Sequence, residues 1–86
     1  MGDYSIIFAR SAERELESLP SKAVNQIFPK IASLSEKPRP RGCKKLSGEG
    51  NLWRIRVGNY RVIYSIDDVG HIVDVIQVRH RSDAYR

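Results

Sequence analysis

The chain has 86 residues, of which 41% are apolar and 29% are charged, and its formal net charge is +5. This length suits one small domain with a single core, residues 1–86, and the apolar share excludes a disordered chain. No apolar run approaches the roughly 18 residues that cross a bilayer. We therefore expect a soluble domain without a membrane partner. The start of the chain lacks a basic stretch followed by an apolar core, so we expect a cytoplasmic location.

The positive charge is concentrated in the second half of the chain. Residues 1–38 carry five Lys or Arg and five Asp or Glu, whereas residues 39–86 carry ten and five. This excess attracts anionic partners, either nucleic acid or an acidic protein, and charge alone does not choose between them. The single cysteine and two histidines form no metal-ligand pattern, so we expect neither a metal nor another cofactor.

One strand and two helices are predicted in the first half. Residues 4–9 have apolar side chains at alternating positions on both faces, which indicates an interior strand. Ser11 is suited to cap a short helix that reaches about Leu19. A second helix is predicted from about Pro20, with Pro29 causing a kink or an early break. Its core-facing residues recur at three- and four-residue spacing: Val24, Ile27, Phe28, Ile31 and Leu34.

The second half is predicted to contain a long basic connection and three strands. Residues 36–51 are rich in proline and glycine, which favours a loop. Strands are predicted at 52–57, 60–66 and 71–78, with turn-forming residues between them, and they make an antiparallel meander. The order of elements predicts an α+β fold with an N-terminal strand, two helices and a three-stranded antiparallel meander, the helices packing on one face of the sheet.

Several arginines are predicted to share one face of this sheet. Arg54 and Arg56 project to the same side of their strand, because successive side chains alternate. Arg61 follows the turn, and its side depends on register, which sequence fixes poorly. One arginine on the solvent face of a strand usually serves only solubility and protection of the sheet edge. The set is more informative, since five arginines on contiguous strands with few acids between them indicate an anion-binding face: Arg54, Arg56, Arg61, Arg79 and Arg81.

The aromatic residues and one histidine add to this interpretation. Trp53, Tyr60 and Tyr64 are expected to pack in the core or the sheet. Tyr85 differs, since a terminal tyrosine beside a basic cluster can stack on an unpaired base. His80 titrates near neutrality and could act as an acid or base, with a structural role as the equal alternative.

Four segments of the chain resemble the RelE family of toxins, part of the RelE/ParE superfamily of type II toxin–antitoxin modules. They are residues 8–12, 45–48, 53–64 and 78–85. The resemblance covers nearly the whole chain and implies a RelE-like fold. It also implies a ribosome-dependent endoribonuclease that cleaves mRNA in the ribosomal A site and inhibits translation. The implied partners are the ribosome, mRNA and an acidic, partly disordered RelB-like antitoxin that forms a hetero-oligomer with the toxin.

The resemblance implies roles for individual residues. The family's metal-independent reaction is attack by a ribose 2′-hydroxyl on the adjacent phosphate. Arg61 and Arg54 would clamp that phosphate and Arg56 would assist. Well-known members have lysines at positions 54 and 56, so this departure keeps phosphate clamping but weakens any proposal that the strand supplies the base. The remaining implied contributors act in proton transfer or charge relief (Arg79, His80, Arg81), nucleotide ordering (Tyr85) and RNA binding (Arg39, Arg41, Lys44, Lys45).

Two alternatives remain open at this level. The ParE group resembles this fold but inhibits DNA gyrase by binding it, without nuclease chemistry. A non-catalytic RNA-binding module would use the same basic face through phosphate contacts alone. The arginines together with His80 and Tyr85 favour the nuclease, because a pure binder needs no such set.

Overall fold

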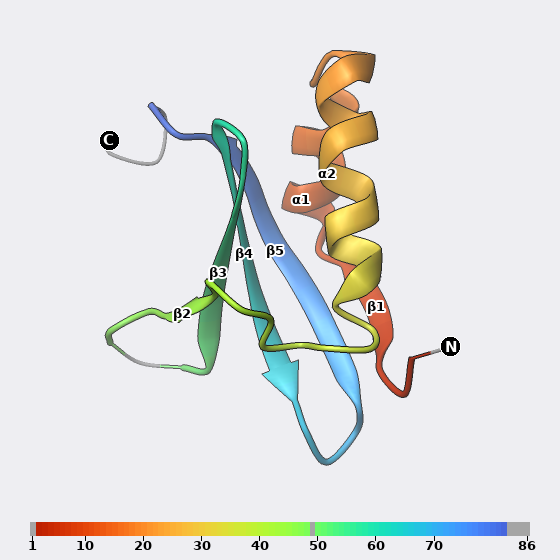
Figure 1. Ribbon diagram of the computed structural model, residues 1–86, viewed down its shortest axis with the longest axis vertical. Helices are drawn as coiled ribbons and strands as arrows, with labels where there is room; N and C mark the ends of the chain where they lie inside the picture. The colour runs from red at the N-terminus through yellow and green to blue at the C-terminus, as the bar shows by residue number, and fades with distance from the viewer. Residues whose placement is uncertain (1, 49, 83–86) are drawn as a thin grey trace.

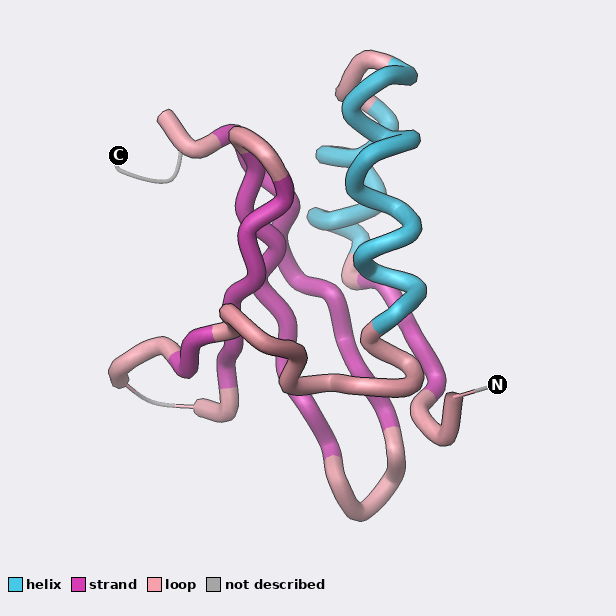
Figure 2. The backbone as a smooth tube through the Cα atoms, viewed as in Figure 1, coloured by secondary structure: helices cyan, strands magenta, loops and turns pink. Residues whose placement is uncertain are grey.

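The computed structural model describes residues 2–48 and 50–82, which form a five-stranded sheet with two helices on one face (Figure 1, Figure 2). The strand order is β1-β5-β4-β3-β2, with β1 parallel to β5 and the other neighbours antiparallel. The predicted α+β class, with helices on one side, is confirmed. The elements are β1 (Ser5–Phe8), α1 (Arg10–Glu17), α2 (Ser21–Ser33), β2 (Lys44–Lys45), β3 (Leu52–Val57), β4 (Tyr60–Asp67) and β5 (Ile72–His80).

Two strands differ from the sequence prediction. Residues 44–45 form β2, where a continuous loop was predicted, because they pair with Trp53 and Arg54 of β3. The strand β1 lies at the edge of the sheet, so the prediction of an interior strand is wrong. Its Ile7 is 47% exposed. Apolar side chains on both faces of a strand therefore did not require neighbours on both edges.

The core lies between α2 and the helix-facing side of the sheet. Ile27 and Ile31 of α2 are almost fully buried and pack in one cluster with Val62 and Tyr64 of β4. Phe28 belongs to the predicted apolar pattern of this helix, but it is 49% exposed. Neither helix that the structure describes is long and apolar enough to cross a membrane.

The helix α2 continues through Pro29 to Ser33, so an early break is wrong, and the alternative of a kink at Pro29 stays a prediction. Proline has no N–H, and the carbonyl of Asn25 therefore lacks its usual helical donor. Both residues are exposed, so water can satisfy that carbonyl. Ile27 and Ile31, on the buried side, hold the helix against the sheet on either side of Pro29.

The strand β5 contains a bulge that changes the faces of its side chains. Its pairing with β4 shifts between Ile63 and Tyr64, which leaves Ile76 as an extra residue in β5. An extra residue moves every later side chain to the other face. As a result Val75 and Val78 are both buried in the core although they are three positions apart.

Side chains of α1 bind the backbone of β5 beside this bulge. Ser11 was predicted to cap α1, but its Oγ instead donates to the carbonyl of Ile76 at 2.8 Å. Glu15 Oε1 accepts the N–H of Val78 at 2.9 Å. Since β1 pairs with β5 only as far as Val75, these side chains take the place of a neighbouring strand.

Replacing Ile27 with Ala is expected to lower the free energy of unfolding by about 2 to 5 kcal/mol, because it leaves a cavity in the core. Phe28→Ala is the matched control on the same helix. This substitution should lower the free energy of unfolding by clearly less, since about half of the Phe28 side chain is exposed. Urea denaturation of both variants measures the difference, and equal losses would contradict this placement of the core.

Candidate functional site

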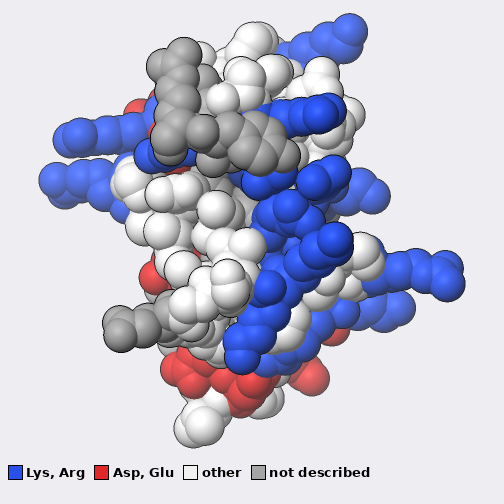
Figure 3. Space-filling model, turned by 90° about the vertical axis from the view of Figure 1, so that its left-hand side faces the viewer, with Lys and Arg blue, Asp and Glu red and all other residues white. Residues whose placement is uncertain are grey.

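Basic side chains gather on the face of the sheet turned away from the helices (Figure 3), and strand pairing orders them in two rows. Arg56 of β3 lies opposite Arg61 of β4, which lies opposite Arg79 of β5. Lys44 of β2 lies opposite Arg54 of β3. Directly opposed residues share a face, with Cβ atoms about 5 Å apart. We call this surface the basic face: Lys44, Arg54, Arg56, Arg61 and Arg79.

The basic face brings guanidinium groups of like charge close together. Arg54 is only 9% exposed and Arg61 is half-buried, whereas Arg56 and Arg79 are exposed. Like charges opposite each other on neighbouring strands destabilise a sheet, and burial of a guanidinium adds a desolvation cost. An anionic ligand reduces this repulsion. Phosphate groups suit it well, since a guanidinium donates two parallel hydrogen bonds to them.

Arg79 is tied to α1 at one end of the row. Its Nε donates to Glu15 Oε2 at 2.7 Å, while the other oxygen of that carboxylate holds the N–H of Val78. The terminal nitrogens of the guanidinium make no hydrogen bond to a described residue, so they are available to a ligand. Glu15 was not among the predicted site residues, because 64 positions separate it from Arg79 and no local pattern links them.

His80 lies on the helix-facing side of the sheet, away from the basic face. It pairs with Tyr60, and the two rings meet edge-on with centroids 5.3 Å apart. It lines an open hollow of about 400 Å³ together with Leu19 and Glu15. Its Nδ1 accepts the N–H of Ser82 at 3.2 Å. A neutral imidazole with this bond carries its proton on Nε2.

The chain end is only partly described. Arg81 is exposed, and its backbone N–H donates to the carbonyl of Asn59 at 2.6 Å, which fixes the end of β5 to the β3–β4 turn. Tyr85, for which base stacking was predicted, lies outside the described residues. Within residues 2–48 and 50–82, no three His, Cys, Asp or Glu side chains gather in a way that could hold a metal ion.

The four basic residues predicted to bind RNA from the connection lie in different places. Lys44 belongs to the basic face. Lys45 lies opposite Trp53 and therefore on the other face, with its Nζ 6.0 Å from the centre of the indole ring. Arg41 lines a cleft beside α2. Arg39 is held within the protein by an ion pair.

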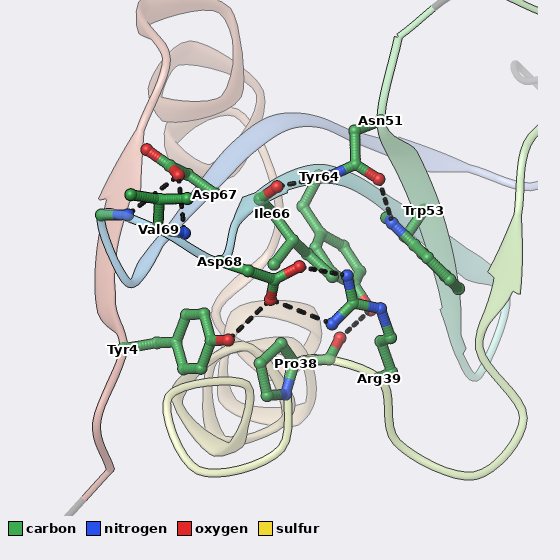
Figure 4. A network of polar contacts seen from close by, with 11 residues as sticks. Tyr4, Pro38, Arg39, Asn51, Trp53, Tyr64, Ile66, Asp67, Asp68 and Val69 are labelled. Carbon is green, nitrogen blue, oxygen red and sulfur yellow. Dashed lines mark hydrogen bonds and ion pairs between the residues drawn. The ribbon is translucent and has the colours of Figure 1, made fainter.

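That ion pair belongs to a polar network between the connection and the β4–β5 turn (Figure 4). Arg39 donates to both carboxylate oxygens of Asp68, at 3.2 and 2.8 Å, and its guanidinium lies 4.8 Å from the Trp53 ring centre. The hydroxyl of Tyr4 donates to the same carboxylate at 2.7 Å. Hydrogen bonds lower the pKa of Asp68 to about 2, the larger effect coming from Arg39 and the smaller one from Tyr4. Arg39 is therefore an anchor of the connection.

Further hydrogen bonds fix the two ends of the connection. The hydroxyl of Tyr64 donates to the carbonyl of Pro38 at 2.6 Å, and burial raises the pKa of this phenol. At the other end, the Asn51 amide donates to the carbonyl of Ile66, and its oxygen accepts from Trp53 Nε1 at 2.8 Å. These contacts hold β2, which lies between the two ends, against β3.

Comparisons with known proteins point to one group. A family model described as the ParE toxin of the type II toxin–antitoxin system parDE matches residues 6–85. The chain is 33% identical to Toxin RelE of Mycobacterium tuberculosis over 87 residues, covering 96% of this chain and 87% of the relative. It is 34% identical to Toxin RelG of the same organism, with 96% and 97% covered. The crystal structure of the RelBE2 toxin–antitoxin complex from that organism matches with a TM-score of 0.82 at 32% identity, covering 92% of this chain and 99% of that one.

The ion pair between Arg39 and Asp68 should make stability depend on pH. The pKa of the Asp68 carboxyl is about 2 in the folded chain, compared with 3.8 for an unperturbed aspartate. The ion pair therefore stabilises the fold above about pH 3.8. This contribution is lost as the pH falls from there towards 2. Urea denaturation at a series of pH values should show wild type losing its advantage over Asp68→Asn in that window. A constant difference between the two proteins would contradict the assignment.

Proposed function

The chain belongs to the RelE and ParE family of toxins from type II toxin–antitoxin systems, and we propose that it cleaves mRNA on the ribosome. The observation that carries this proposal is the row formed by Arg56, Arg61 and Arg79 in register on three neighbouring strands. The proposed reaction is attack of a ribose 2′-hydroxyl on its own adjacent phosphate. It leaves a cyclic phosphate on one fragment and a 5′-hydroxyl on the other.

In this reaction the basic face would stabilise charge on the phosphate. The five-coordinate phosphorus gains negative charge in the transition state, and cations already held in place lower its energy. Arginine suits this role because it stays charged and its planar fork matches two phosphate oxygens. We assign the scissile phosphate to Arg61, at the centre of the row, and to Arg54, with Arg56 assisting.

Proton transfer requires groups other than these arginines. With a pKa above about 12, a guanidinium scarcely ever accepts a proton at neutral pH. Arg79 lies in the row and would supply charge relief. For His80, the position on the helix-facing side and the hydrogen bond from Ser82 support a structural role. The assignment of Arg81 to charge relief and of Tyr85 to nucleotide ordering stays a prediction.

The proposed regulator is an antitoxin that covers the basic face. The solved relative from M. tuberculosis is a toxin–antitoxin complex, which supports a partner of this kind. A net charge of +5 predicts an acidic partner, and long-range attraction speeds the association of such a pair. An acidic, partly disordered chain that folds on docking would exclude RNA phosphates from the same surface.

Replacing Arg61 with Ala is expected to slow mRNA cleavage on programmed ribosomes by about 100-fold or more, because the central cation of the row is lost. Arg61→Lys keeps the charge without the fork and should restore only part of the rate. Arg10→Ala, on the exposed side of α1, is the control and should cut like wild type. Circular dichroism would verify folding, and analysis of fragment ends should find the cyclic phosphate. Normal cleavage by folded Arg61→Ala would rule out this assignment.

A second candidate function is inhibition of DNA gyrase, which the match to the ParE toxin model favours. A gyrase inhibitor would block supercoiling of relaxed plasmid DNA and leave ribosome-bound message intact. Under our proposal the same preparation should produce cuts phased with the ribosome and leave supercoiling unchanged. Running both assays on wild type and Arg61→Ala separates the two functions.

A further inference from the structure

A second basic site lies beside the basic face, at the outer edge of β3. A cleft of about 160 Å³ is formed there by α2, the connection and β3. We call it the β3-edge cleft. Half of its lining residues are basic and none of the described ones is acidic, and the full lining is Lys30, Ser33, Pro40, Arg41, Ile55 and Arg56.

The course of the backbone explains why this edge is open. The short strand β2 pairs only with Trp53 and Arg54, so no described strand pairs with the outer edge of β3 from Ile55 onward. The connection leaves the lower end of α2 and crosses to β2 (Figure 1). Its residues Pro40 and Arg41 line the cleft opposite β3. Because α2 does not break at Pro29, its last turn brings Lys30 to the cleft.

The cations of the cleft differ from the anchored arginines elsewhere in the protein. Arg39 and Arg79 are bound by carboxylates. Lys30, Arg41 and Arg56 make no ion pair with any residue that the structure describes. Three cations around a small concave surface raise the local positive potential. Its volume is below the roughly 300 Å³ of ordinary small-molecule pockets, so it suits one compact anionic group.

We propose that the β3-edge cleft binds a backbone phosphate of an RNA strand that also lies on the basic face. This inference rests on the proposed function and adds a second phosphate subsite to it. Arg56 belongs to both surfaces, so an RNA strand can follow a continuous path from Arg61 through Arg56 to Lys30 and Arg41. A polynucleotide suits this path because its phosphates repeat along one chain, and occupation of the first site favours occupation of the second.

The test is the binding of a fluorescein-labelled, 2′-O-methyl single-stranded RNA, which cannot be cut, to Lys30→Ala and Arg41→Ala. Fluorescence anisotropy over a series of salt concentrations gives the affinity and its salt dependence. Each phosphate contact to a single strand contributes about 0.7 to the log–log slope. Each variant should therefore lower the slope by about 0.7 and weaken binding about fivefold at about 0.1 M salt. Lys22→Ala, two turns earlier on α2, is the matched control and should retain the wild-type affinity and slope.

Wild-type affinity and slope in both variants would overturn the inference. So would weakened binding of an acidic antitoxin peptide with RNA binding intact, because the cleft would then serve a protein partner. Failure of the proposed function is distinguishable, because it appears as normal cleavage by Arg61→Ala. In that case reduced RNA affinity of the Lys30 and Arg41 variants would still support the cleft as a phosphate site.

Discussion

The bulge in β5 decides which side chains the basic face contains. Strict alternation from the buried Val75 would place Arg79 on the helix-facing side. The extra residue Ile76 reverses the alternation, so that Arg79 joins Arg61 in the row while Val78 enters the core. Two side chains of α1 hydrogen-bond to the backbone at this point, each contributing about 1 kcal/mol. A helix on one face of the sheet thus fixes the geometry of the other face.

Two of the arginines are held in place by carboxylates. Arg39 faces Asp68, and Arg79 is bound through Nε by Glu15. The first pair fixes the connection, and with it the position of β2, whereas the second aligns one end of the row. Arg56 faces solvent and makes no ion pair with any residue that the structure describes, so an anionic ligand can stabilise its charge. The number of basic residues in a segment therefore did not indicate which of them are held by carboxylates within the fold.

Features that depend on residues close together in the sequence could be predicted from the sequence. The strand 52–57 was predicted with the bounds that the structure shows, since its alternation and the following Gly58-Asn59 turn are local signals. The same alternation correctly placed Arg54 and Arg56 on one face. The second helix and the meander followed from their apolar periodicity. The first helix was predicted from Ser11 as its cap, a role that Ser11 does not play. The family followed from four ordered segments, so the broad function class was accessible before the fold.

The tertiary structure alone decided how these elements meet, because their contacts join residues far apart in the chain. Register places Arg61 between Arg56 and Arg79, and a bulge that no local pattern marks moves His80 to the opposite face. Pairing across the sheet edge creates β2, and packing against the sheet carries α2 through Pro29. Sequence periodicity specifies the side of a single strand or helix on which a residue lies. Which residues of different elements become neighbours depends on the packing of the whole chain.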